Sequence, residues 1–191
     1  SEVAAYDPRA QREMKRWKLD RRALLGQDPG PPNDAFEGLA FREEAGRPGG
    51  GVLYLAHQRT PAMLIALAVD ITGAPGTLGA GHVLGRWSFE GHGDITAVTY
   101  VPALQRLVLI ADKEDQLLVV GSNGAVETAI PLPGQQQEGV AIDPVGNLWI
   151  ADDQDKSLLK MDGALAAIQK WQRDPAAFQD PLGGAQPGGS K

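Results

Sequence analysis

The sequence predicts an all-β protein of the β-propeller class, and two observations carry that prediction. First, a short strand-like phrase recurs three times in the 191 residues, as FEGLAF at 36–41, ITAVTY at 95–100 and QEGVAI at 137–142. Second, each copy is followed by a turn and two further apolar runs, which makes a repeat of about 40 residues. Repeats of this length buried only against their neighbours are typical of propeller blades.

The runs that follow each phrase are strand-sized and match one another. The second run of each copy closes on alanine and a polar residue, as LYLAH at 53–57, VLIAD at 108–112 and LWIAD at 148–152. The third runs lie at 63–69, 116–120 and 157–161. Steps such as Asn123-Gly124 and Asp162-Gly163 separate apolar runs, which is typical of hairpin turns.

These repeats predict four-stranded antiparallel blades and a set of boundaries. We expect a propeller portion over 1–172 and a flexible Pro/Gly-rich tail over 173–191. The portion divides into a partial blade at 1–25 and blades at about 35–89, 94–132 and 137–171. The partial blade contributes two strands, the second an exposed outer strand, and the Gly- and Pro-rich insertions 42–51 and 72–81 are expected on the rim. The tryptophans 17, 87, 149 and 171 are expected mostly at strand positions in the core.

The predicted blades do not complete a ring. About three and a half blades are present, whereas propellers typically close with four to eight. An arc left open would expose the flanks of its end blades. The sequence is therefore interpreted as the C-terminal part of a larger propeller, or as a chain whose missing blades come from a second polypeptide.

Composition excludes several classes of function. The formal net charge is −6, and the 18 Lys and Arg residues are scattered apart from a cluster between 9 and 22, which disfavours a nucleic-acid partner. Cysteine is absent, which rules out disulfides, thiolate metal sites and a Cys nucleophile. No apolar run is long enough for a transmembrane segment. The composition fits the cytosol and a bacterial periplasm equally well.

The repeat phrases resemble known propeller families. Residues 137–152 (QEGVAIDPVGNLWIAD) resemble the NHL-type repeat, and the chain over about 3–171 looks more like the SdiA-regulated (YjiK-like) family, whose blades carry comparable Glu-Gly-Leu-Ala phrases. The resemblance implies a six-bladed bacterial propeller related to TolB-like and NHL proteins, often exported or membrane-tethered, with no well-established activity. The sequence departs from the pattern at Thr96 and at His57, which stands at the usual Asp position.

A first candidate site consists of carboxylates at the start of the repeats. Glu37 and Glu138 occupy the same place in two copies, and Asp94, with Thr96, precedes the phrase in the third. If these side chains reach a central channel, their oxygens would suit Ca²⁺ as a cofactor. The alternative is that the repeated Glu-Gly pairs satisfy backbone N–H groups, which needs no metal.

A second candidate site consists of the polar residues that close the second strand of each copy. His57, Asp112 and Asp152 are equivalent in the repeat and could bind a ligand or act as acid and base at a channel mouth. The alternative is turn chemistry, in which these side chains hydrogen-bond the next hairpin. The loop histidines 82 and 92 are expected to be solvated.

Three functional hypotheses follow, and whether the protein is an enzyme stays open. No nucleophile elbow, catalytic triad or phosphate loop is present. The leading hypothesis is a non-catalytic scaffold that binds a protein partner or a small ligand, with Ca²⁺ in the channel as an option. The second is a metal-dependent hydrolase of the lactonase or phosphoesterase type. The third is a structural component of a larger assembly.

Overall fold

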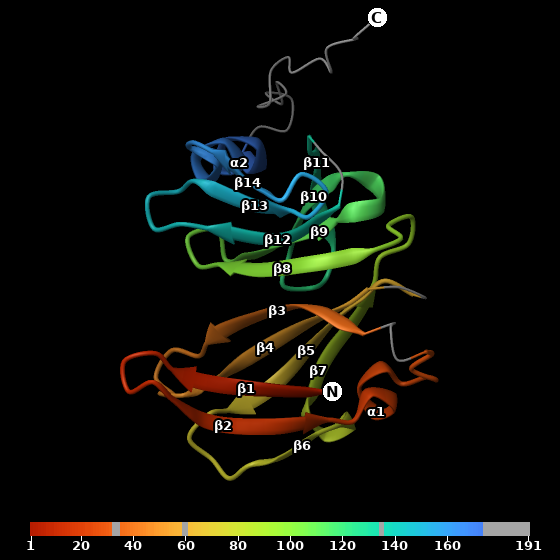
Figure 1. Cartoon of the computed structure of the whole chain (residues 1–191), viewed down its shortest axis with the longest axis vertical. Helices are drawn as coiled ribbons and strands as arrows, with labels where there is room; N and C mark the ends of the chain where they lie inside the picture. Colours follow the sequence, from red (N-terminus) through yellow and green to blue (C-terminus); the bar gives the residue numbers. More distant parts are fainter. Residues whose placement is uncertain (32–34, 59–60, 134–135, 174–191) are drawn as a thin grey trace, which may run out of the picture. The chain divides into compact units, whose positions relative to one another are not determined.

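A computed structural model of the chain describes residues 1–31, 35–58, 61–133 and 136–173. The chain divides into two compact units, Ser1–Ile95 and Thr96–Lys191, which we describe separately. The described residues form four sheets of three or four strands, each built mainly from sequence-adjacent antiparallel strands (Figure 1). The predicted all-β class is confirmed.

The first unit contains one complete four-stranded antiparallel sheet. Its strands are β3 (Phe36–Glu43), β4 (Gly50–His57), β5 (Met63–Asp70) and β7 (Val83–Ser88), in that order across the sheet. Strands β4 and β5 are almost continuously apolar and are buried along nearly their whole length. Such runs are typical of strands covered on both faces.

The second sheet of this unit differs from the predicted partial blade. Strands β1 (Glu2–Asp7) and β2 (Arg12–Leu19) form the expected antiparallel hairpin. A third strand, β6 (Gly76–Leu78), pairs with β2 in parallel and comes from the insertion 72–81, which the sequence predicted only as rim loop. Because β6 covers its edge, β2 is not an exposed outer strand, and Trp17 and Leu19 join the core of the unit.

A short helix follows the hairpin. Helix α1 (Arg21–Leu25) begins at Asp20, whose Oδ1 accepts a hydrogen bond from the Ala23 N–H at 3.0 Å, and ends at Gly26 in the left-handed conformation. Arg86 of β7 donates from Nε to the Leu24 carbonyl oxygen at 2.6 Å. The guanidinium therefore satisfies a carbonyl at the end of the helix, where intrahelical partners are lacking.

The second unit begins with a four-stranded sheet in the predicted order. Strands β8 (Ile95–Val101), β9 (Arg106–Ala111), β10 (Gln116–Val120) and β11 (Val126–Pro131) are adjacent in sequence and in space. A 3₁₀ turn, η2 (Asp112–Glu114), joins β9 to β10, and Asp115 after it adopts a positive φ of 48°.

The third repeat has three strands and a helix. Strands β12 (Gln137–Ile142), β13 (Leu148–Asp152) and β14 (Ser157–Met161) pair as expected, but helix α2 (Ala164–Arg173) stands where a fourth strand was predicted. Ala164, Ile168 and Trp171 recur at helical spacing and are buried, so the segment packs as a helix. The predicted tail from 174 onward lies outside the described residues.

One carboxylate organises the turn between β12 and β13. Asp143 Oδ1 accepts hydrogen bonds from the Val145 and Asn147 N–H groups at 3.0 and 2.9 Å. Its Oδ2 accepts from the Asn147 side-chain amide and from the Trp149 indole N–H, both at 3.0 Å. These bonds, the Trp149 bond first, lower the pKa of Asp143 from 3.8 to about 2.

The lowered pKa predicts an acid-sensitive turn. Because the folded-state pKa is depressed, the stabilisation is fully present above the unfolded pKa of 3.8 and is lost as pH falls through about 2. We expect Asp143→Asn to unfold at lower urea concentration than the unaltered chain at pH 7, and the difference to shrink between pH 4 and pH 2. Asp155→Asn, a change of an exposed residue, should show no such convergence. A difference that is constant with pH would contradict the assignment.

Candidate functional site

The polar residues that close the second strands hold the backbone. Asp112 follows β9, and its Oδ1 accepts a hydrogen bond at 2.7 Å from the main-chain N–H of Gln137, the first residue of β12. This bond ties the end of one sheet to the start of the next. The buried Thr96 hydroxyl donates to the carbonyl oxygen of the same Gln137 at 2.6 Å.

The other two members of this set have similar bonds. Asp152, at the end of β13, is buried, and its Oδ1 accepts from the Asp155 N–H at 2.9 Å. His57, at the end of β4, is also buried and lies 3.2 Å through Nδ1 from the Pro61 carbonyl oxygen. Its ring meets Phe36 edge-on, with 5.7 Å between the ring centroids. Burial among main-chain partners is the geometry expected for turn chemistry.

The repeated glutamates lie at matching irregularities of two sheets. The register of β3 on β4 shifts between Phe36 and Gly38, and that of β12 on β13 shifts between Gln137 and Gly139. Glu37 and Glu138 are therefore the extra residues of two β-bulges, and both are exposed. A bulge at a fixed place explains why the Glu-Gly pair recurs, whatever else the carboxylates do.

The structure brings together only part of each predicted set. Glu37, Asp94 and His57 lie in the first unit, and Glu138, Asp112 and Asp152 lie in the second. Asp112 and Asp152 both meet Gln137, the former through its hydrogen bond and the latter as the cross-strand partner. Within the described residues, no group of three or more His, Asp or Glu side chains could hold a metal ion. The calcium site and the ligand-binding set stay predictions.

Gln137 is a residue that sequence reasoning missed. It is fully buried, its Nε2 donates to the Pro133 carbonyl oxygen at 3.0 Å, and its Oε1 has no hydrogen-bond partner. The equivalent residues of the other repeats, Phe36 and Ile95, are apolar. Gln137 could have been identified from the sequence as a polar residue at a repeat position that is otherwise apolar.

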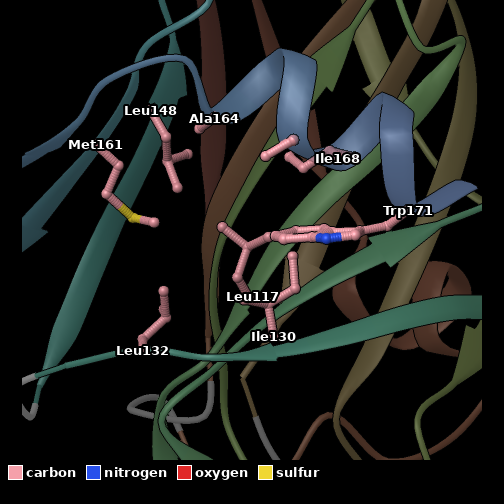
Figure 2. A pocket seen from close by; sticks show the side chains of 9 residues that line it. Leu117, Ile130, Leu132, Leu148, Met161, Ala164, Ile168 and Trp171 are labelled. Carbon is pink, nitrogen blue, oxygen red and sulfur yellow. The ribbon is translucent and has the colours of Figure 1, made fainter. Parts of the chain in front are cut away.

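An apolar cavity lies beneath α2 in the second unit (Figure 2). Its volume is about 20 Å³, which is room for about one water molecule, but its lining offers almost no polar atom to hold one. The side chains around it come from β10, β11, β13, β14 and α2 and include Leu117, Ile130, Leu148 and Trp171. We interpret this cavity as a packing gap in the core, not as a binding site.

A larger and more polar pocket lies in the first unit. We name it the Lys15 pocket; its volume is about 330 Å³, and it is lined by strands β2, β5 and β6 and the residues around them. The buried side chains Trp17, Val69 and Leu78 give it apolar walls. Its charged and titratable lining residues are Lys15, Arg47, Asp70 and His82. His82, expected to be solvated, is exposed and lines this pocket.

Lys15 is the unusual member of this lining. Lys15 is only 8% exposed. Its Nζ donates a hydrogen bond to the Asp70 carbonyl oxygen at 2.5 Å and lies 5.0 Å from the centre of the Trp17 ring. The Asp70 carboxylate is occupied by other donors: Oδ1 accepts from the Thr72 hydroxyl at 2.6 Å and from the Thr72 N–H at 2.8 Å. These bonds, the hydroxyl first, lower the pKa of Asp70.

Antiparallel sheets repeated along the chain, each beginning with an equivalent strand, define a protein of the β-propeller class. The SdiA-regulated family model matches residues 85–170 and confirms the resemblance predicted from the sequence. No curated protein matches the chain. No helix in 1–31, 35–58, 61–133 or 136–173 is long and apolar enough to span a membrane.

Solved structures similar to this chain are distant. One is a protein of unknown function from Bacteroides caccae, with 13% identity and a TM-score of 0.48, covering 83% of this chain and 50% of that one. A second is streptogramin B lyase, with 14% identity, a TM-score of 0.42 and coverages of 70% and 42%. A third is a luciferin-regenerating enzyme, with 15% identity, a TM-score of 0.44 and coverages of 85% and 65%. The chain spans about half the length of the first two.

Proposed function

We propose that this chain is part of a non-catalytic propeller scaffold that binds a partner or a small ligand. The observation that carries the proposal is the use of Asp112, Asp152 and His57, each of which lies at a strand end and bonds the main chain. A general acid or base must reach a substrate proton, and a catalytic metal ligand must direct its oxygen at the ion. Side chains committed to main-chain partners are better suited to holding blades rigid.

The test compares this proposal with the second hypothesis, a metal-dependent hydrolase. We expect the melting temperature of the chain to be the same with and without millimolar Ca²⁺, and expect no hydrolysis of lactone or phosphoester substrates with the metal present. The two measurements are repeated on Glu37→Gln and Glu138→Gln, with Glu43→Gln as the control. Glu43 is also exposed and lies at the opposite end of β3 from Glu37.

The calcium site would be confirmed by a rise in melting temperature with Ca²⁺ that Glu138→Gln abolishes and Glu43→Gln retains. If hydrolysis accompanies that rise, the non-catalytic hypothesis is overturned. The same rise without hydrolysis would place Ca²⁺ in the scaffold as a structural ion. The hydrolysis assay therefore tests whether the protein is an enzyme, and the melting measurement tests calcium binding independently.

A further inference from the structure

The Lys15 pocket contains a buried ammonium group that no carboxylate of the described residues pairs. A lysine is almost never fully buried unless it is paired, because removing an ammonium from water is costly. The bonds of Lys15 are to a carbonyl oxygen and to the Trp17 ring, and in the part of the chain that the structure describes no carboxylate forms an ion pair with it. The positive charge at this wall is therefore left without a negative partner.

The neighbouring charges do not remove the imbalance. Asp70 is engaged by Thr72 and by the Gly73 N–H, and its Oδ2 lies 3.7 Å from an Arg47 nitrogen. Arg47 is about half exposed, and its other terminal nitrogen lies 3.6 Å from a Glu44 carboxylate oxygen. Because Arg47 is balanced by these two carboxylates, Lys15 is the lining cation that no carboxylate in the described ranges pairs.

We propose that the Lys15 pocket binds a small organic monocarboxylate, with the Lys15 ammonium at the carboxylate and the apolar body against Trp17. This inference rests on the proposed binding function and gives it a place and a ligand class. The pocket volume of about 330 Å³ is within the range of about 300–1,000 Å³ that small-molecule sites occupy. A monoanion matches the single unpaired ammonium of Lys15, whereas the second negative charge of a phosphate dianion would have no cation to pair with and would repel the Asp70 carboxylate.

The wall composition favours an anion with an apolar body. Trp17, Val69 and Leu78 are each at most 5% exposed, so they form a fixed apolar surface beside the ammonium. Gly73 leaves room there: a Cβ at this position would lie 3.5 Å from Lys15 Nζ, and the residue has no positive φ. Gly73→Ala therefore adds a methyl group next to the ammonium without changing charge or straining the backbone.

The test is a titration of the full chain with benzoate, followed by calorimetry or by NMR shifts of the Trp17 indole. We expect benzoate to bind about tenfold or more tightly than uncharged benzyl alcohol, because one charge-assisted hydrogen bond is worth that factor. Inorganic phosphate should bind more weakly than benzoate. Lys15→Met keeps the length of the side chain and removes the charge, and it should weaken benzoate binding by about tenfold or more.

Lys18→Met is the matched control, since Lys18 lies on the same strand but is exposed, and it should leave benzoate binding unchanged. Gly73→Ala should weaken benzoate binding without changing the melting temperature, which keeps the test decisive if Lys15→Met fails to fold. Equal binding of benzoate and benzyl alcohol, or equal losses in Lys15→Met and Lys18→Met, would overturn the inference. Those outcomes leave the calcium and hydrolysis measurements untouched, so the two proposals fail separately.

Discussion

Replacing Trp171 by alanine is expected to lower the free energy of unfolding of the second unit by about 3–5 kcal/mol, the usual range for a buried tryptophan. Trp171 is 6% exposed and is the last buried residue of α2. It packs with Leu117 and Ile130 of the neighbouring four-stranded sheet (Figure 2). Because the cavity beneath α2 already leaves a small gap, truncation would enlarge it instead of letting the core close.

The measurement is urea unfolding followed by far-UV circular dichroism, since removal of one of the four tryptophans would itself change the fluorescence signal. Ile168→Ala, one turn earlier and 2% exposed, should cost about 2–5 kcal/mol. Lys170→Ala, an exposed control on the same helix, should change stability by less than about 0.5 kcal/mol. A Trp171→Ala cost as small as that of the control would mean that α2 does not complete this core.

The Asp112–Gln137 bond predicts different effects for two substitutions at one position. Asp112→Ala leaves the Gln137 N–H, which belongs to a fully buried residue, without its acceptor, and it should cost about 1–3 kcal/mol. Asp112→Asn keeps an oxygen that can accept the same bond and should cost much less. Urea unfolding of the two variants, with the exposed Lys113→Ala as control, measures the difference.

This pair of variants also bears on the predicted ligand set. If the role of Asp112 is to hold the backbone, an acceptor oxygen is sufficient and its charge is dispensable. Equal destabilisation by Asp112→Asn and Asp112→Ala would contradict that role and show that the negative charge itself is needed. Equal stability of both variants and the unaltered chain would likewise show that the bond to Gln137 does not explain the presence of Asp112.

Much of the sheet structure was predictable because the apolar pattern and the turn residues that encode strands and tight turns are local in the sequence. Apolar runs marked the first three strands of each repeat, whereas the fourth strands β7 and β11 were expected only from the blade class. The helix α2 was missed, although its buried residues recur at helical spacing, because Trp171 was read as a strand aromatic. The bulges at Glu37 and Glu138 were not predicted either, since a register shift depends on the partner strand.

The all-β class, the repeat, the family resemblance and the positions at which polar side chains recur follow from local sequence patterns. Each of these depends on residues within about one repeat of one another. The pairing of β6 with β2, the burial of Lys15 against the Asp70 carbonyl oxygen and the bond between Asp112 and Gln137 are seen only in the tertiary structure. These contacts join residues 25 to about 60 positions apart, as in the Lys15 to Asp70 bond, and no local pattern encodes which distant strand or loop covers a given face.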